Sequence, residues 1–468
     1  MLVLHRRTVN CRREVRPVRD VAAWQQWRFE PAGEFSRRKM SAGEEYFFDF
    51  GEQLVGSPSL TFDCGEFVDY DAPVRLRLRF GELPAETVLG LANFTGTLSR
   101  AWYQEEFLIV DLLHGSVTLP RRYAFRYLAI RVEDANRPFY LTGLSAEHTT
   151  AAGECLPATI ADPELAQIDR VAVKTLENCM QGFFEDGPKR DRRLGLGDLR
   201  LQAMVNAVTF RNFELVEHSL RLLAAQTGPD GWFPACVFDR EPPCAGGVIM
   251  DYALLLGPTL REHYAYSGRL GIVKELFELS LRQLELVRPD FDDEGLFHDP
   301  GGIWLFLDHK PELNRESGMQ CVYIFSLKEH AKLARLLNRE ELALELEAEA
   351  EKLTASLRRH RYDRTSGLIL SGPENQRSYA TTAWAIIAGV LDAAEGRKAL
   401  QAIESDDKAV KPVTPYLWHC ILESCFRCGE REAGLRLIRS YWGEMVRQGA
   451  DTFLGGVCPG RTGVLSVL

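Results

Sequence analysis

The chain has 468 residues, of which 46% are hydrophobic and 26% are charged, and its formal net charge is -10. This length is too great for one ordinary core, so we expect at least two domains. The acidic balance argues against a nucleic-acid partner, which needs clustered Lys and Arg. No uninterrupted apolar stretch is long enough to span a membrane. Residues 1–27 have no apolar run of signal-peptide length, so we expect a cytoplasmic protein.

The eleven cysteines are odd in number and scattered along the chain, which is not the pattern of a disulfide framework. Cys425 and Cys428 form a CxxC, but no second Cys/His pair lies at a matching spacing for zinc. We therefore expect buried, reduced thiols and no metal site. Because nucleotide-binding, zinc-protease and serine-hydrolase motifs are also missing, we expect no cofactor.

From about Tyr46 to Ala146 the sequence has the period of β-strands. Residues 74–80 alternate apolar and charged side chains without a break, as in a half-buried strand. Further strands, separated by Gly, Pro and Asp, are predicted at Tyr46–Phe50, Ser59–Phe62, Phe107–Leu112 and Tyr123–Val132. Short strands between turn signals are typical of a β-sandwich, which we assign to residues 1–155.

After about Leu156 the period becomes helical. Asp162 is a predicted N-cap, and Pro163 stands at the first helical position, where its missing N–H does no harm. Further helices are predicted at Leu199–Val208, Phe213–Ala225, Tyr252–Tyr266, Ile272–Val287, Gln320–Leu337, Glu340–Leu357, Thr381–Leu391, Tyr416–Arg427 and Arg431–Arg447. No fixed repeat indicates a solenoid. We interpret residues 156–468 as one large helical domain, with the boundary between Gly153 and Asp162.

The densest cluster of charge lies between two predicted helices, at residues 185–198 (E-D-G-P-K-R-D-R-R-L-G-L-G-D). Gly187, Pro188 and two later glycines exclude a regular helix, so this segment is a shaped loop. Its acids and bases can neutralise one another, as in a salt-bridged surface loop. They can equally form a functional site, which the apolar Phe183 and Phe184 before the loop favour.

The segment from Asp186 to Asp198 resembles the hallmark loop of the α-L-rhamnosidases of glycoside hydrolase family 78, whose pattern reads D-x-P-x-R-D-E-R-x-G-W-x-G-D. The likeness continues in order along the chain, at Phe48–Glu52, Phe125–Tyr127, Pro229–Trp232, Met250–Tyr252, Leu307–His309 and Gly449–Phe453. The resemblance implies a β-sandwich followed by an (α/α)6 helical barrel. It also implies inverting hydrolysis of terminal rhamnosyl or related linkages, with a carbohydrate as the partner.

Inverting hydrolysis needs a protonated carboxyl for the leaving oxygen and a carboxylate that activates water, about 6.5–9.5 Å apart. The resemblance implies that Asp186, Arg190 and Asp198 contact the sugar, so we expect them to converge on one pocket. Further expected sugar contacts, in matched or aromatic loops, are Trp232, Asp251, Trp304 and Asp308.

The chain departs from the family pattern at both catalytic carboxylates. Arg192 stands where the family's general acid falls, and Gly455 stands where its general base falls. We expect other carboxylates to serve instead, namely Asp191, Glu185, Glu316 and Glu374. A catalytically impaired carbohydrate-binding relative and another (α/α)6 carbohydrate-active enzyme stay open as alternatives. The likeness stops after Gly455, so we also expect the helical domain to be truncated at its C-terminal end.

Overall fold

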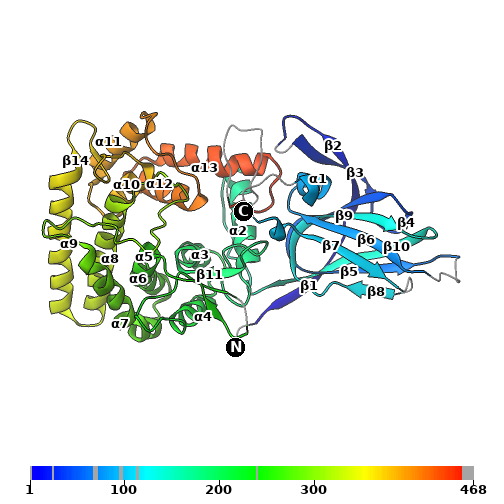
Figure 1. Ribbon diagram of the computed structural model, residues 1–468, viewed down its shortest axis with the longest axis horizontal. Helices are drawn as coiled ribbons and strands as arrows, with labels where there is room; N and C mark the ends of the chain where they lie inside the picture. Colours follow the sequence, from blue (N-terminus) through cyan, green and yellow to red (C-terminus); the bar gives the residue numbers. More distant parts are fainter. Residues whose placement is uncertain are drawn as a thin grey trace.

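The computed structural model describes residues 3–23, 26–66, 72–93, 99–111, 115–238 and 241–455. An N-terminal sheet domain is followed by a helical domain (Figure 1). The long strands end with β10 (Phe139–Thr150), and the first long helix is α2 (Pro163–Cys179). In the described part of the chain, every strand after α2 has only two or three residues. None of the described helices is both long and apolar enough to cross a membrane.

Ten antiparallel strands of the N-terminal domain form one hydrogen-bonded sheet, whose main path runs β1-β10-β5-β9-β6-β7. The other strands pair along its edges and its middle, β8 and β2 with β5, β3 with β2 and β4 with β10. The remaining strands are β1 (His5–Asn10), β2 (Arg13–Arg19), β3 (Trp27–Glu34), β4 (Arg38–Met40), β5 (Glu45–Asp63), β6 (Val74–Gly81), β7 (Glu105–Val110), β8 (Gly115–Thr118) and β9 (Tyr123–Asp134).

β5 is one strand of 19 residues where the sequence pattern predicted two. Its register against β9 shifts between Asp49 and Leu54, and Gly51 within this gap has a φ of 85°. Glycine adopts this conformation readily, because it has no Cβ. The irregularity lets the first half of β5 pair with β2 and the second half with β8 and β10. A glycine that signals a turn in the sequence therefore marks a bulge in a continuous strand.

The helices of the second domain contact one another in succession, α3 with α6, α6 with α8, α8 with α10, and α10 with α12. The last helix, α13, contacts the first, and Arg439 of α13 pairs with Asp162 at 2.5 Å and Glu164 at 3.0 Å. The helices after α2 are α3 (Leu196–Val208), α4 (Phe213–Ala224), α5 (Met250–Leu254), α6 (Leu256–Ser267), α7 (Leu270–Val287), α8 (Glu316–Leu336), α9 (Glu340–Arg361), α10 (Tyr379–Ile387), α11 (Ala393–Glu404), α12 (Pro415–Arg427) and α13 (Arg431–Arg447).

Two local predictions about helices have different outcomes. The N-cap at Asp162 is confirmed, because its side chain accepts a hydrogen bond from Leu165 N at 3.0 Å. The single helix predicted over Tyr252–Tyr266 is wrong, since the structure has two helices, α5 and α6, that meet at Leu255. Pro258 has no N–H to donate to the Leu254 carbonyl, which accepts from Ser326 Oγ at 2.7 Å instead.

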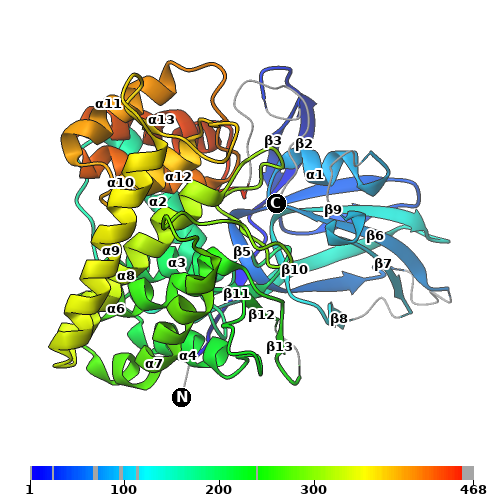
Figure 2. The same ribbon diagram turned by 60° about the vertical axis from the view of Figure 1, so that its left-hand side comes forward.

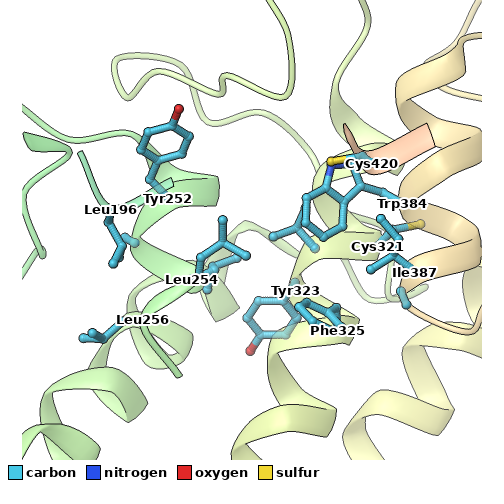
Figure 3. Close-up of a cluster of buried hydrophobic side chains, with 14 of the residues drawn as sticks. Leu196, Tyr252, Leu254, Leu256, Cys321, Tyr323, Phe325, Trp384, Ile387 and Cys420 are labelled. Carbon is cyan, nitrogen blue, oxygen red and sulfur yellow. The ribbon is translucent and has the colours of Figure 1, made fainter. Parts of the chain in front are cut away.

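The helical domain is filled by apolar side chains from its inner helices. Figure 3 shows Tyr252, Phe325 and Trp384 among these side chains, which belong to α5, α8 and α10. Trp384 is completely buried. The ten cysteines in the described part of the chain are free thiols, and those of the CxxC, Cys425 and Cys428, are buried. Among the described residues, no group of three or more His, Cys, Asp or Glu side chains has the arrangement of a metal site.

Candidate active site

The charged loop leads from the end of α2 to the start of α3. Its last residues form β11 (Arg193–Gly195), which pairs with β12 (Cys236–Phe238), and β12 pairs with β13 (Cys244–Ala245). This small sheet lies on the side of the helical domain that faces the sheet domain (Figure 2). A Cβ at Gly195 would stand 2.5 Å from Asp198 Oδ2, so only glycine allows this close approach. The turn thereby directs the carboxylate of Asp198 back toward the loop.

Acidic and basic side chains of this loop form one cluster. Arg193 pairs with Asp186 at 2.9 Å and with Asp191 at 2.9 Å, and Arg190 pairs with Asp191 at 3.0 Å. Asp198, in the first turn of α3, interacts electrostatically with Asp186 and Arg193. The structure thus brings together four residues that the sequence singled out, and it adds Arg193, which forms the centre of the cluster.

The cluster holds its protons more tightly than isolated aspartates do. Burial, and then the neighbouring charge of Asp198, raise the pKa of Asp186 to about 7, although Arg193 opposes the shift. Burial raises the pKa of Asp198 to about 6. Carboxylates that share a site repel one another when all are ionised, so at least one pKa rises and their titrations are coupled. The cluster therefore retains a proton close to neutral pH, which is the state that a general acid needs.

Aromatic rings form a wall next to this cluster. The Phe306 ring lies 4.8 Å from His309, 5.6 Å from Trp304, 5.6 Å from Tyr252 and 5.7 Å from Tyr416. Burial, and then the charge of Asp198, raise the pKa of Tyr252, which places its phenol beside the acidic cluster. The Trp304 side chain is 48% exposed. Aromatic rings beside a few convergent polar groups are typical of small-ligand pockets.

Phe306, His309 and Tyr416 were missed by the sequence analysis as members of the site. His309 is the last residue of the matched stretch Leu307–His309 and Phe306 directly precedes it, so proximity in sequence was an available signal. Tyr416 lies near the start of α12, far away in sequence, and nothing in its local pattern distinguishes it from a core aromatic.

Asp251 and Asp308, expected as sugar contacts, have backbone groups as their partners. Asp251 accepts from Phe306 N at 2.8 Å and Leu307 N at 3.2 Å. Asp308 accepts from Val413 N at 2.8 Å, and from Thr414 N at 3.0 Å and Thr414 Oγ1 at 2.7 Å. Both carboxylates are buried. The two carboxylates therefore position the aromatic wall indirectly. Asp251 holds the backbone of the Phe306 loop, and Asp308 holds the start of α12.

Trp232 and Glu185 lie away from the centre of the cluster. Trp232 follows a turn at Gly231, half-buried against the helical core on the side of α7. Glu185 is buried and pairs with Arg122 of the sheet domain at 2.6 Å. It also lines a separate cavity of about 560 Å³, together with Gln181 and Phe183. The Glu185 carboxylate is therefore engaged with the sheet domain.

Glu316 and Glu374, expected as water activators, differ in their surroundings. Glu316 begins α8, is one-fifth exposed and lies 3.6 Å from Nδ1 of His298. Glu374 is exposed in a turn, and in the described part of the chain no hydrogen bond or ion pair involves its carboxylate. Of these two carboxylates, only Glu316 is partly buried and has a charged or polar side chain as its partner in the described part of the chain.

Arg192 points away from the cluster. Its φ is 51°, its Nε donates to the Pro188 carbonyl at 2.8 Å, and its Nη2 donates to the Arg122 carbonyl at 2.6 Å. Position 192 therefore faces the sheet domain. The preceding residue, Asp191, is the one directed into the cluster.

The late segment from Gly449 to Phe453 lies between the two domains. Asp451 pairs with Arg126 at 2.6 Å and accepts from Gln53 N at 3.0 Å, both in the sheet domain. Leu454 is buried in a small apolar cluster with Leu83, Tyr441, Met445 and Ala450. Gly455, the position of the expected base, directly follows this cluster.

A sheet domain joined to a closed succession of helices, with an acidic and aromatic site in the interhelical loops, is the construction of a six-hairpin glycoside hydrolase. The family model described as glycosyl hydrolase family 78 alpha-rhamnosidase N-terminal domain matches residues 11–149. The family model described as bacterial alpha-L-rhamnosidase 6 hairpin glycosidase domain matches residues 159–454. The chain belongs to the α-L-rhamnosidase-type glycoside hydrolases of family 78.

Solved structures agree with this assignment. A rhamnosidase from Klebsiella oxytoca with rhamnose bound is similar with a TM-score of 0.93 and 36% identity, over 98% of this chain and 90% of that one. A family 78 rhamnosidase of Bacillus sp. GL1 has a TM-score of 0.78 at 19% identity, and the match covers 93% of this chain but 45% of that one. The α-L-rhamnosidase of Streptomyces avermitilis complexed with L-rhamnose has a TM-score of 0.65 at 17% identity, covering 91% and 40%. Among curated proteins, no sequence matches this chain significantly.

Proposed function

We propose that this chain binds terminal α-L-rhamnosyl groups and hydrolyses their linkages with inversion, at low turnover. The observation that carries the proposal is the cluster of Asp186, Asp191 and Asp198 around Arg193, beside an aromatic wall that includes a half-exposed tryptophan. The similar Klebsiella protein, which has rhamnose bound, supports the choice of sugar. We further propose that residues 1–155 form a β-sandwich and that residues 156–468 form an (α/α)6 barrel, whose mouth holds the pocket.

Asp191 is the proposed proton donor to the leaving oxygen. It lies inside the cluster, whereas its neighbour Arg192 is bonded to carbonyl groups on the other side of the loop. The proton that the cluster retains near neutral pH is held on Asp186 and Asp198, and in this proposal it passes to Asp191 for the donation step. Asp186, Arg190 and Asp198 are the proposed partners of the sugar hydroxyls, because charged groups make strong, directional hydrogen bonds.

The half-exposed ring of Trp304 is the proposed stacking surface for the sugar ring or the aglycone. Trp232, Asp251 and Asp308 remain proposed contributors to the pocket, but Asp251 and Asp308 contribute through the loops that they hold. These assignments make Trp304 the most direct apolar contact of the substrate.

The site lacks a carboxylate at the position where the family has its water-activating base. Gly455 stands at the position where the family has its base. Glu316 is the preferred substitute, because its carboxylate is partly buried next to His298, whereas Glu374 is exposed and Glu185 is paired with Arg122. A missing general base typically costs about a hundred- to ten-thousandfold in rate. We therefore expect measurable binding of rhamnose together with slow hydrolysis.

Calorimetry with L-rhamnose and turnover of an activated aryl α-L-rhamnoside test this proposal together. Wild type is expected to bind rhamnose, and Asp198→Ala, which removes one sugar partner, is expected not to. Turnover of an unactivated alkyl α-L-rhamnoside that disappears in Asp191→Asn, while turnover of the activated aryl substrate falls much less, supports the assigned donor, because only a poor leaving group needs the proton. Binding without any turnover would instead identify a non-catalytic relative, and the absence of binding would overturn the rhamnosyl pocket.

A further inference from the structure

Lys189 occupies an unusual place in the site loop, between the cluster residues and the sheet domain. Its Nζ lies 2.6 Å from Glu86 Oε1 and 3.2 Å from Glu82 Oε2. Glu86 belongs to the short helix α1 (Pro84–Leu89) of the sheet domain, and Glu82 stands one residue before the N-cap of that helix, Leu83. The side chains of Lys189 and Glu86 are only 14% and 5% exposed. An ammonium group is therefore buried between two carboxylates of the other domain.

Burial of these charges is compensated within the interface. Burial opposes the charged form of Lys189, but the carboxylates of Glu82 and Glu86 outweigh it and raise the pKa of the lysine. Burial raises the pKa of Glu82, although Lys189 opposes the shift. Gln53 Nε2 donates to Glu82 at 2.9 Å, and the Glu82 N–H donates to Glu86 at 2.6 Å. Buried ion pairs are favourable only when further hydrogen bonds satisfy their atoms, as they do here.

The sheet domain also holds the loop at other points on the same side. Gln104 Nε2 donates to the Lys189 carbonyl at 3.1 Å, and the Arg190 guanidinium lies 5.0 Å from the centre of the Trp102 ring. Arg192 donates to the Arg122 carbonyl at 2.6 Å. The same loop carries Asp186 and Asp191, which pair with Arg193 in the acidic cluster. One short segment thus has a face fixed to the sheet domain and a face that forms the acidic cluster.

We propose that Lys189 is a positioning residue, through which the sheet domain holds the site loop in the geometry that binds the sugar. Lys189 touches none of the proposed sugar partners through its ammonium group, and it acts by fixing the backbone between Pro188 and Arg190. A displacement of about 1 Å in such a loop can cost on the order of a hundredfold in catalysis. The part of this inference that concerns sugar binding rests on the proposed function.

The chain offers a matched control for this idea. Lys174 of α2 is a second lysine that joins the two domains, and its side chain is 17% exposed. Its Nζ lies 2.9 Å from Glu52 of β5 and 3.2 Å from Glu177 of α2. Both partners lie outside the site loop. Lys174→Met therefore makes the same chemical change at the same domain interface without releasing the loop.

Hydrogen exchange and calorimetry on the full chain distinguish the two lysines. In Lys189→Met we expect faster amide exchange in peptides covering residues 186–193, and an L-rhamnose Kd higher by roughly tenfold or more. In Lys174→Met we expect both quantities to stay at their wild-type values, even if the melting temperature falls. If Lys189→Met does not fold, Glu86→Gln removes the shorter ion pair while keeping the size of the side chain, and the same changes are expected.

Wild-type exchange and affinity in a folded Lys189→Met protein, or equal changes in both lysine variants, would overturn the positioning role. If wild type binds no rhamnose, the proposed function fails, and exchange in residues 186–193 still decides whether Lys189 holds the loop. Faster exchange confined to that loop supports the claim that Lys189 holds it in place, independently of which ligand the protein binds.

Discussion

Arg193 determines the properties of the site at the scale of single residues, because it is shared by two aspartates and faces a third. Its guanidinium group pairs with Asp186 and Asp191, and it opposes the rise in the pKa of Asp198. Two cations, Arg190 and Arg193, face three carboxylates, so one negative charge is left unbalanced. Burial of the carboxylates, together with this unbalanced charge, is the physical reason that the cluster retains a proton.

This excess of acid predicts how stability depends on pH. The pKa of Asp186 rises from 3.8 to about 7 on folding, so its contribution is fully present below pH 4 and is lost as the pH rises toward 7. Asp186→Asn cannot ionise. The free energy of unfolding of the variant, relative to wild type, should therefore increase between pH 4 and 7, by on the order of 2–4 kcal/mol. Urea unfolding at several pH values measures this, and parallel curves for the two proteins would contradict it.

Arg192→Glu tests whether a carboxylate at position 192 can act as the general acid. The arginine side chain bonds two carbonyl groups at the domain junction, so we expect the variant to gain no turnover. It should lose about 1–3 kcal/mol of stability, because both carbonyls lose a charged donor. Turnover of an aryl rhamnoside and thermal unfolding are the measurements. A large gain in rate would show that position 192 is the place of the proton donor, as the family pattern implies.

Among the elements of the fold, the loops behind the aromatic wall are held by buried carboxylates. Asp308 joins the loop of Phe306 and His309 to the start of α12, and Asp251 joins the same loop to α5. Such carboxylates cost a good deal to bury and are stable only because backbone N–H groups surround them. The aromatic wall is therefore a tertiary feature, made by three segments that are distant in sequence.

Asp308→Ala separates a supporting role from direct contact with the sugar. The change leaves Val413 N, Thr414 N and Thr414 Oγ1 without their acceptor, so we expect a loss of about 2–4 kcal/mol in the free energy of unfolding. Rhamnose affinity should fall only moderately, through movement of the wall. Calorimetry and urea unfolding compare the two effects. Loss of affinity with unchanged stability would instead place Asp308 in direct contact with the sugar.

The sequence predicted those elements whose cause is local. Alternation in residues 74–80 and the cap at Asp162 depend on neighbours along the chain, and the structure has both. The division at Leu255 has a local cause that the predicted helix ignored, because Pro258 has no N–H to donate to the Leu254 carbonyl. Only the group that replaces it, Ser326 Oγ of α8, is distant in sequence. In the site, the motif located the charged loop. Which side chains face inward could not be predicted, because Arg192 and Lys189 take their directions from the sheet domain.

At the scale of the whole molecule, the site lies at the junction of the two domains. The sheet domain holds the charged loop through Lys189, and it holds the late segment through Asp451 and Arg126. Leu83 of the sheet domain packs against Leu454, directly before Gly455. The acid-bearing loop and the position expected for the base are thus anchored on the same domain, although about 260 residues separate them.

Because both segments are anchored on the same domain, we expect a carboxylate at position 455 to restore the general base that activates water. In Gly455→Glu we expect turnover of an aryl α-L-rhamnoside to rise by roughly a hundredfold, because a positioned general base contributes on that scale. Gly455→Gln has nearly the same size but cannot accept the proton, so it should remain as slow as wild type. Rhamnose affinity should be similar in all three proteins, since Asp186, Arg190 and Asp198 are unchanged. Equal rates in the Glu and Gln variants would show that position 455 is not where the base is lacking, and would leave Glu316→Gln as the variant to abolish the residual activity.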